Sequence, residues 1–233
     1  MQDFRVAFRT LRNNPSFTLV VMATLGLGIG INTAIFSVVN GVVLRPLPYN
    51  EPDQVMTLWE ANPRLDIAQD QVAGATCLDW VERSQSFASL GAYNFQSFIM
   101  AGERKGESVR VSGAQISPTI FGVVGVQRTL GRAFREEEAI PGNDFVAILS
   151  HGFWTQRFGA DPEVIGSAVY LGKKPYTLVG VMPPDFEFPP GARDVEIWKP
   201  LAIDTGSLDV RGMRIYNVVG RLNSGVSVDQ ARV

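Results

Sequence analysis

The longest apolar segment of the chain runs from Phe17 to Leu44, and no charged residue lies between Arg12 and Arg45. A helix of these twenty-eight residues rises roughly 42 Å. The hydrocarbon core of a bilayer is about 30 Å thick, so such a helix crosses it with some tilt. A signal peptide has a shorter apolar region and a small-residue cleavage site, and neither is seen here. The pattern predicts a transmembrane helix over residues 17–44.

Small and polar residues are unevenly distributed around this predicted helix. They recur at alternating steps of four and three residues, at Gly26, Gly30, Thr33, Ser37 and Asn40. At about 100° per residue these positions gather on one side of the helix. Small residues allow a second helix to approach closely, and hydroxyl and amide groups form hydrogen bonds across such an interface. We therefore expect a helix-packing seam against a partner helix, with chance placement in a single-pass anchor as the alternative.

The segment before the predicted span is basic and amphipathic. Its apolar residues recur at i, i+4 and i+7, and Arg5, Arg9 and Arg12 fall on the neighbouring arc. This pattern predicts an elbow helix over residues 1–16 that lies in the membrane interface, with its arginines as anchors on anionic lipid headgroups. Positively charged residues stay on the cytoplasmic side. We expect the N-terminus in the cytoplasm and the residues after about 45 outside it.

The predicted helix leads into a stiff membrane-exit joint formed by Arg45, Pro46 and Pro48, because proline fixes its own φ. Residues 1–45 carry a net charge of +3, whereas the remainder holds 17 basic and 22 acidic side chains, a net of −5. Phosphate contacts need a basic surface, so the acidic outer region argues against nucleic-acid binding.

The outer region, residues 45–233, alternates strand-like and helix-like patterns. Strands are expected at 54–59, 108–112, 145–149, 168–171, 176–182, 195–198 and 215–221, and helices or turns at 77–83, 117–124, 150–158 and 161–165. This mixture predicts an α+β fold class, with a mixed α/β extracytoplasmic domain after the membrane helix. Ser227 resembles a helix N-cap close to the last residue, so we expect the domain to be incomplete at its C-terminus.

Candidate chemistry is sparse in the sequence. One histidine, His151, and one cysteine, Cys77, are too few for a zinc site of such ligands or for an internal disulfide. The acidic run at residues 136–138 does not have the spacing of a calcium loop, and we expect a solvated turn there. No catalytic, cofactor-binding or metal-binding set emerges, so we do not expect an enzyme.

Four ordered stretches of the chain resemble one family. The first is FRVAFRTLRNNPSFTLVVMATLGLGIGINTAIFSVVNGVVLRPLPYNEPDQV, followed by SPTIFGVVGVQRTLGRAFREEE, VAILSHGFWTQRFGADPEVIG and YTLVGVMPPDFEFP. They are similar to MacB-like, FtsX-type ABC transporter permeases, in particular to the duplicated orphan-permease branch abundant in acidobacteria. The first stretch corresponds to the first transmembrane helix, and the other three to the MacB-like periplasmic core domain.

This resemblance implies a location in the bacterial cytoplasmic (inner) membrane and a role in mechanotransmission. ATP would be bound by a separate cytoplasmic ABC ATPase, whose hydrolysis would move the periplasmic domain for efflux or for export of envelope components. A second permease unit or copy is implied as a partner, and in some relatives a periplasmic adaptor and an outer-membrane channel. The alternatives are a single-pass membrane-anchored sensor or binding module and, less in keeping with the residues, an envelope enzyme.

Overall fold

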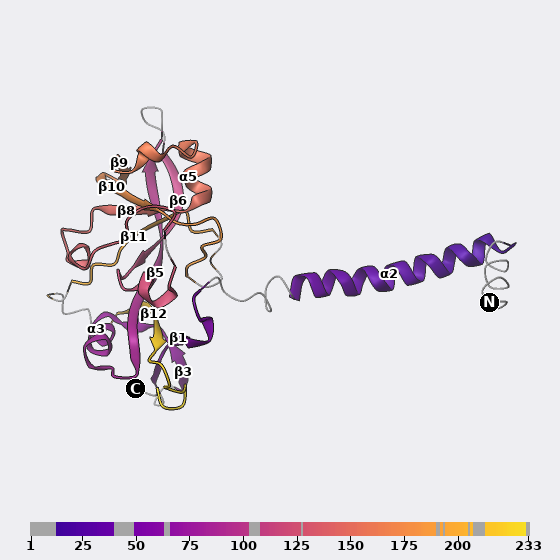
Figure 1. Cartoon of the computed structure of the whole chain (residues 1–233), viewed down its shortest axis with the longest axis horizontal. Coiled ribbons are helices and arrows are strands. Elements are labelled where there is room, and N and C mark those ends of the chain that lie inside the picture. Colours follow the sequence, from indigo (N-terminus) through magenta and orange to yellow (C-terminus); the bar gives the residue numbers. More distant parts are fainter. Residues whose placement is uncertain are drawn as a thin grey trace. The chain divides into compact units, whose positions relative to one another are not determined.

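The computed structural model describes residues 13–39, 49–62, 66–102, 108–126, 128–189, 192, 194–204, 206 and 213–231. The chain forms two compact units, Met1–Pro46 and Leu47–Val233 (Figure 1). The first contains helix α2 (Pro15–Val39), which over Pro15–Ser37 is long and apolar enough to cross a membrane. The helix begins at Pro15, because proline suits the first turn of a helix, where its missing N–H costs nothing. The predicted end at Leu44 lies outside the described residues.

The second unit is built on a ten-stranded mixed sheet, accompanied by a two-stranded sheet of β2 and β3. Its strands are β1 (Val55–Leu58), β2 (Glu60–Asn62), β3 (Ile67–Asp70), β4 (Val72–Ala73), β5 (Phe87–Ala101), β6 (Ser108–Ile116), β7 (Leu130–Gly131), β8 (Val146–Leu149), β9 (Ala168–Leu171), β10 (Lys174–Val181), β11 (Ile197–Pro200) and β12 (Arg214–Leu222). Its helices are α3 (Gly74–Arg83), α4 (Ile120–Val124) and α5 (His151–Phe158), with 3₁₀ turns at Pro52–Gln54, Glu136–Ala139 and Pro162–Val164.

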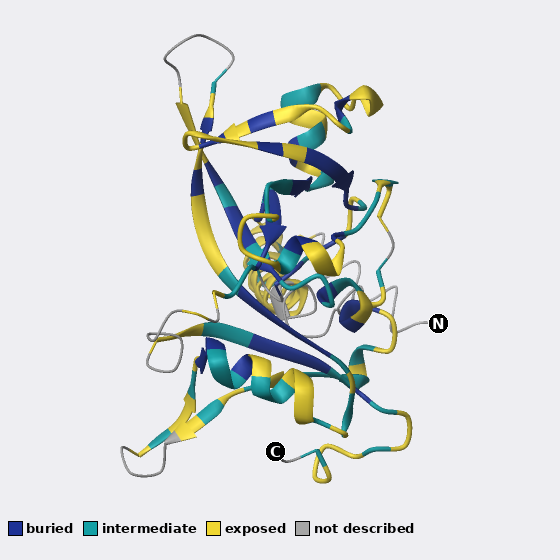
Figure 2. Cartoon of the chain, turned by 90° about the vertical axis from the view of Figure 1, so that its left-hand side faces the viewer, coloured by how far each residue is buried: buried dark blue, intermediate teal, exposed yellow. Residues whose placement is uncertain are grey.

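Six of the strands pair in a closed ring in the order β5, β6, β11, β8, β10 and β9, and a single pairing of Met100 with Leu171 joins β9 back to β5. Side chains alternate across a strand, so one set points into the ring. This set forms a buried cluster that includes Val111, Leu149 and Ile197, with Phe153 of α5 packed against it. Figure 2 shows buried residues along these strands.

The remaining part of the sheet, β1, β12 and the first half of β5, is covered by a helix on each face. Helix α4 lies over β5 at Gly91, where an added Cβ would be 2.6 Å from Cδ1 of Ile120. Glycine suits this close approach, because a Cβ there would force the side chain of Ile120 to shift. Helix α3 contributes Cys77 to a separate buried cluster with Leu90 and Val218. The long strand β5 runs through both parts of the unit (Figure 1).

The mixed α/β fold class is confirmed, and each of the seven expected strands matches an observed one to within a few residues. The 15-residue strand β5 was not predicted as a strand. The expected helix at 117–124 is shorter, since α4 begins at Ile120. The next two expected elements each begin with a side-chain cap that their first residues supply: Ser150 accepts a hydrogen bond from the amide of Phe153, and Asp161 accepts one from the amide of Glu163.

Candidate functional site

Tyr49 is the first residue described after the helix, and its side chain lies in the aromatic part of the core of the second unit, Leu47–Val233, which we call the outer unit. Only 6% of its surface is exposed. Its hydroxyl donates a 2.7 Å hydrogen bond to the carbonyl oxygen of Glu187. Burial raises the pKa of Tyr49, and the nearby Tyr93 and Glu187 raise it further. The hydroxyl therefore stays protonated and serves as a permanent donor.

The loop that accepts this hydrogen bond is held a second time by a tryptophan. Trp198 on β11 donates its indole N–H to the carbonyl oxygen of Phe188 at 2.9 Å. The ring of Phe188 meets Tyr93 edge-on with centroids 5.1 Å apart, and Phe186 meets Trp198 in the same way at 5.3 Å. Two consecutive carbonyls, those of Glu187 and Phe188, thus accept hydrogen bonds from aromatic side chains of two distant segments. The loop is thereby fixed between them.

Arg221 on β12 binds the segment Tyr49–Glu51, which we call the junction segment. Its Nε donates to the carbonyl oxygen of Val123 at 2.9 Å, and its Nη2 donates to that of Asn50. The amide of Asn50 in turn donates to the carbonyl oxygen of Val124 at 3.0 Å. Both main-chain polar groups of this residue are satisfied, one by α4 and one by β12. The junction segment is therefore attached to the outer unit through its main chain as well as through a buried side chain.

A buried cation lies inside the strand ring. The Nζ of Lys199 lies 3.3 Å from Oδ2 of Asp144 and 3.2 Å from the hydroxyl of Tyr176. The side chain of Lys199 is only 10% exposed. Burying an ammonium group is costly unless a counter-ion and hydrogen-bond partners accompany it. The carboxylate and the phenol supply both, so this polar cluster ties β11 to β10 and to Asp144, two residues before β8.

The acidic run at residues 136–138 was expected to be a solvated turn, and this is wrong for one of its three glutamates. Glu136 is exposed, but Glu138 is buried, with 6% of its surface accessible. Its carboxylate accepts hydrogen bonds of 3.0 and 2.6 Å from the guanidinium of Arg132 and one of 2.8 Å from the amide of Arg135. Burial alone would raise the pKa of Glu138, yet the hydrogen bonds from Arg132 and Arg135 prevail, and the pKa is lowered. The carboxylate of Glu138 therefore holds Arg132 and Arg135 to the turn, and we call this arrangement the clamp.

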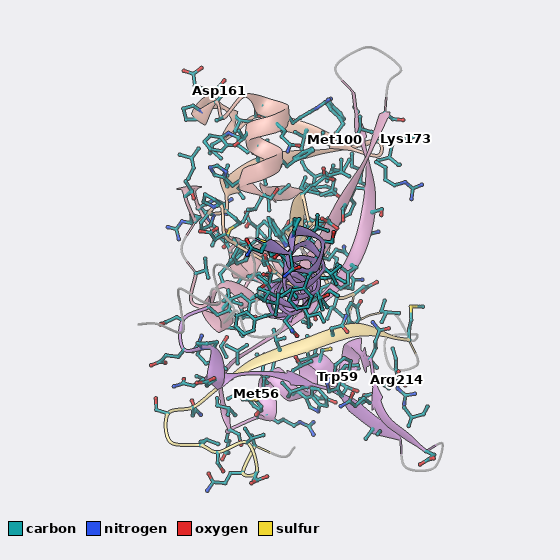
Figure 3. The ribbon with its side chains drawn as sticks, turned by 90° about the vertical axis from the view of Figure 1, so that its right-hand side faces the viewer. Met56, Trp59, Met100, Asp161, Lys173 and Arg214 are labelled. Carbon is teal, nitrogen blue, oxygen red and sulfur yellow. The ribbon has the colours of Figure 1, made fainter. Side chains whose placement is uncertain are left out.

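At one end of the unit, Arg214 of β12 holds the small β2–β3 sheet. Its Nε donates to Oε2 of Glu60 at 2.7 Å, and its Nη1 lies 3.6 Å from Oδ2 of Asp70. Figure 3 shows Arg214 and Trp59 at this end, with Met100 and Lys173 at the opposite end near the ring. The same strand, β12, therefore carries both Arg214 and Arg221, each of which ties a neighbouring segment to the sheet.

The predicted seam residues that the structure describes, Gly26, Gly30, Thr33 and Ser37, all lie on α2. No atom outside the helix lies within 4 Å of a Cβ added at Gly26 or Gly30, so both positions are open to a neighbour. The packing role of the seam stays a prediction. The remaining predicted positions, Asn40, the anchors Arg5, Arg9 and Arg12, and the exit joint Arg45, Pro46 and Pro48, lie outside the described residues.

The two residue types most often used in nucleophilic or metal chemistry lie in structural surroundings. Cys77 is buried, and burial followed by the charge of Glu60 raises its pKa to about 12. His151 begins α5, and its ring contacts that of Trp154 with centroids 5.5 Å apart. Within the described parts of the chain, no group of three or more His, Cys, Asp or Glu side chains is placed to hold a metal ion. The polar groups described above join segments of chain to one another.

Sequence reasoning did not single out Tyr49, Lys199 or Arg221. Lys199 carried a usable signal, because a lone lysine in the apolar run of β11 has to find a buried partner. Arg221 gave no such signal, since an arginine near the end of an alternating strand usually faces solvent. Its acceptors are main-chain carbonyls far away in sequence, which no residue pattern marks.

The family model of the MacB-like periplasmic core domain matches residues 18–233. The fold is similar to the periplasmic region of MacB from Actinobacillus actinomycetemcomitans, with a TM-score of 0.54 and 18% identity over 76% of this chain and 78% of that one. It is also similar to the extracellular domain of the noncanonic ABC-type transporter YknZ from Gram-positive bacteria, with a TM-score of 0.52 and 17% identity over 76% and 86%. No curated protein sequence matches the chain. Since the family model covers nearly the whole chain, the protein belongs to the family of MacB-like periplasmic core domains.

Proposed function

We propose that the chain is part of an ABC-type permease whose outer unit is moved by ATP hydrolysis in a separate cytoplasmic ATPase. Membership of the MacB-like family supports the transporter class, and helix α2 supports attachment to a membrane. The observation that carries the mechanical role is the attachment of the junction segment. Tyr49 is locked into the core, and Asn50 is bound on both sides of its main chain. A displacement that reaches residue 49 is therefore passed to the outer unit.

The proposed arrangement places an interfacial elbow at residues 1–16, a membrane span at 17–44 and a periplasmic domain from 45 onward. The seam on α2 would bind a helix of a second permease unit or copy. The work would be efflux or export of an envelope component, and a periplasmic adaptor with an outer-membrane channel would serve a substrate that leaves the cell. The chain itself would supply movement, and the ATPase would bind the nucleotide.

The test measures movement in the complete natural protein, assembled with its ATPase in lipid nanodiscs. Cysteines replace Phe36, exposed on α2, and Gln156, exposed on α5, and both carry spin labels. Cys77 is buried with a raised pKa, so it competes little for the label. Double electron–electron resonance then compares the nucleotide-free complex with the complex trapped by ADP and vanadate. We expect the distance distribution to shift on trapping.

The control is the same complex built with an ATPase that cannot bind nucleotide, in which the distribution should stay constant. A natural protein that hydrolyses ATP through its partner without any shift would contradict the proposal. A natural protein that binds no ATPase at all would favour the single-pass sensor or binding module.

A further inference from the structure

The junction segment contains a residue whose backbone is held in an unfavourable conformation. Glu51 has φ 47° and ψ 64°, the left-handed region that residues with a Cβ seldom adopt. Such a conformation persists where surrounding contacts impose it. Here the contacts come from Arg221, whose Nη2 binds the carbonyl of Asn50 and whose Nη1 lies 3.5 Å from the carbonyl oxygen of Glu51. The carbonyl oxygen of Glu51 also accepts a hydrogen bond from the amide of Gln54 at 3.0 Å, so a side chain of β12 and the 3₁₀ turn together hold this conformation.

Arg221 connects three parts of the fold: its own strand β12, the junction segment and α4. Its side chain is 13% exposed, and its three nitrogen atoms donate to carbonyls in two separate segments, the junction segment and the end of α4. A guanidinium is permanently charged and presents its donors in a rigid fork, so its geometry fixes the relative positions of the acceptors. The carboxylate of Glu51 is 63% exposed and 3.8 Å from Nη1, so this ion pair contributes little. The connection therefore depends on the main-chain carbonyls.

The junction segment also packs closely against Gly125, the residue that follows α4. Gly125 has φ +67°, and a Cβ added there would lie 2.7 Å from Cβ of Asn50. The junction segment therefore packs closely against the end of α4 as well as against the guanidinium of Arg221. It has little freedom to move without moving both.

The register of the sheet shows what would move with it. Arg221 pairs with Val55 of β1 on one side and with Ser89 of β5 on the other. β1 follows the junction segment after a single 3₁₀ turn, Pro52–Gln54. β5 continues for 15 residues into the strand ring. A load applied at the junction segment therefore reaches the sheet along the chain through β1 and, by way of the guanidinium of Arg221, through β12. The neighbour of β12, β5, extends through both parts of the unit.

We infer that Arg221 is the positioning residue that transmits displacement of the junction segment to β12 and β5. This inference rests on the proposed function and names the contact on which its coupling depends. Its role is to hold the main chain at Asn50 and Glu51 in register with the sheet.

The experiment uses the spin-labelled complex described above and adds three variants. Arg221→Gln removes the charged fork, Arg221→Lys keeps the charge but not the fork, and Glu51→Gln removes only the exposed ion pair. We expect the nucleotide-dependent shift to be lost in both Arg221 variants and retained in Glu51→Gln. ATP hydrolysis should continue in all three, because the ATPase is untouched. Hydrogen exchange of the Asn50 amide should become faster only in the Arg221 variants.

The outcomes distinguish failure of the proposed function from failure of the role of Arg221. No shift in the wild-type complex overturns the proposed function itself. A wild-type shift that persists unchanged in Arg221→Gln overturns only the role of Arg221. Tryptophan fluorescence of each variant establishes that it is folded, and if Arg221→Gln is not folded, Arg221→Lys alone decides: a full shift in that variant contradicts the inference.

Discussion

The ammonium group of Lys199 lies 3.2 Å from the hydroxyl of Tyr176, although the two residues belong to strands separated by β8. The strand between them, β8, carries the fully buried Ala147, which belongs to the same core cluster as Tyr176. The carboxylate of Asp144 completes the cluster. A charge in the interior of the ring is thus made tolerable by residues from three different segments.

Removal of this lysine should destabilise the outer unit. Lys199→Met leaves the carboxylate of Asp144 without its counter-ion, and we expect a loss of about 2–3 kcal/mol. The double variant Lys199→Met with Asp144→Asn should recover part of this loss, because no buried charge remains. Urea unfolding followed by tryptophan fluorescence measures the effect, since all four tryptophans lie in the outer unit. The exposed Lys173→Met serves as control, and equal midpoints for the Lys199 and Lys173 variants would refute the prediction.

The clamp at Glu138 should make stability depend on pH. Its pKa is lowered on folding, so the ionised form stabilises the folded state above the ordinary glutamate pKa of about 4.3. This contribution disappears as the pH falls through the lowered folded-state pKa. Glu138→Gln should therefore cost about 1–3 kcal/mol at neutral pH, with the difference from wild type narrowing in acid. Urea midpoints measured across this pH range provide the check, with the exposed Glu136→Gln as control. A constant difference at all pH values would contradict it.

Two glycines should respond to alanine in opposite directions. A Cβ at Gly113 would overlap the ring of Phe98 and lie 2.8 Å from the carbonyl oxygen of Ile197, so Gly113→Ala should destabilise by about 1–3 kcal/mol. Gly152 lies in α5 with nothing within 4 Å of an added Cβ. Gly152→Ala should stabilise by about 0.5 kcal/mol, because alanine favours the helix. Thermal unfolding of the two variants side by side tests both signs.

The thiol of Cys77 should be unreactive in the folded protein. Its thiol is buried, and a pKa of about 12 leaves almost no thiolate at pH 8. We expect no reaction with Ellman's reagent under native conditions and one equivalent of released thiolate after unfolding in urea. Rapid labelling of the native protein would show that the packing around α3 opens readily.

The seam on α2 predicts a face-dependent effect in the membrane. Gly30→Leu places a large side chain on the face shared with Gly26, whereas Gly28→Leu places it on the other side. If the seam binds another helix, only the first substitution should reduce assembly of the complete permease, because a small residue is needed for close approach. Native gel electrophoresis in mild detergent measures the assembled fraction. An equal effect of both substitutions would contradict the prediction, because it would show that the face of the helix does not matter.

The strands that were predicted correctly are runs rich in β-branched, aromatic and other apolar residues. β9 alternates exposed and buried residues, as in its exposed Tyr170 and buried Leu171, although all four of its residues are apolar in the sequence. β5 lacks this regularity because its two halves meet different surroundings. Around Gly91 both faces are covered, by α4 and by the residues near α3, whereas at Phe95 and Ile99 the face outside the ring is exposed. A strand that changes partners along its length has no single pattern to recognise.

The sequence by itself determined the features that arise from local chemistry. An uncharged run from Phe17 predicts a spanning helix, Ser150 caps α5, and short apolar, β-branched runs interspersed with helical patterns indicate the mixed α/β class, because each depends on neighbours within a few residues. Only the tertiary structure decided that Arg221 would reach the carbonyls of Asn50 and Val123, and that Glu138 would be buried. Main-chain carbonyls are alike at every residue. Which of them faces a given side chain is therefore fixed by how distant segments pack together.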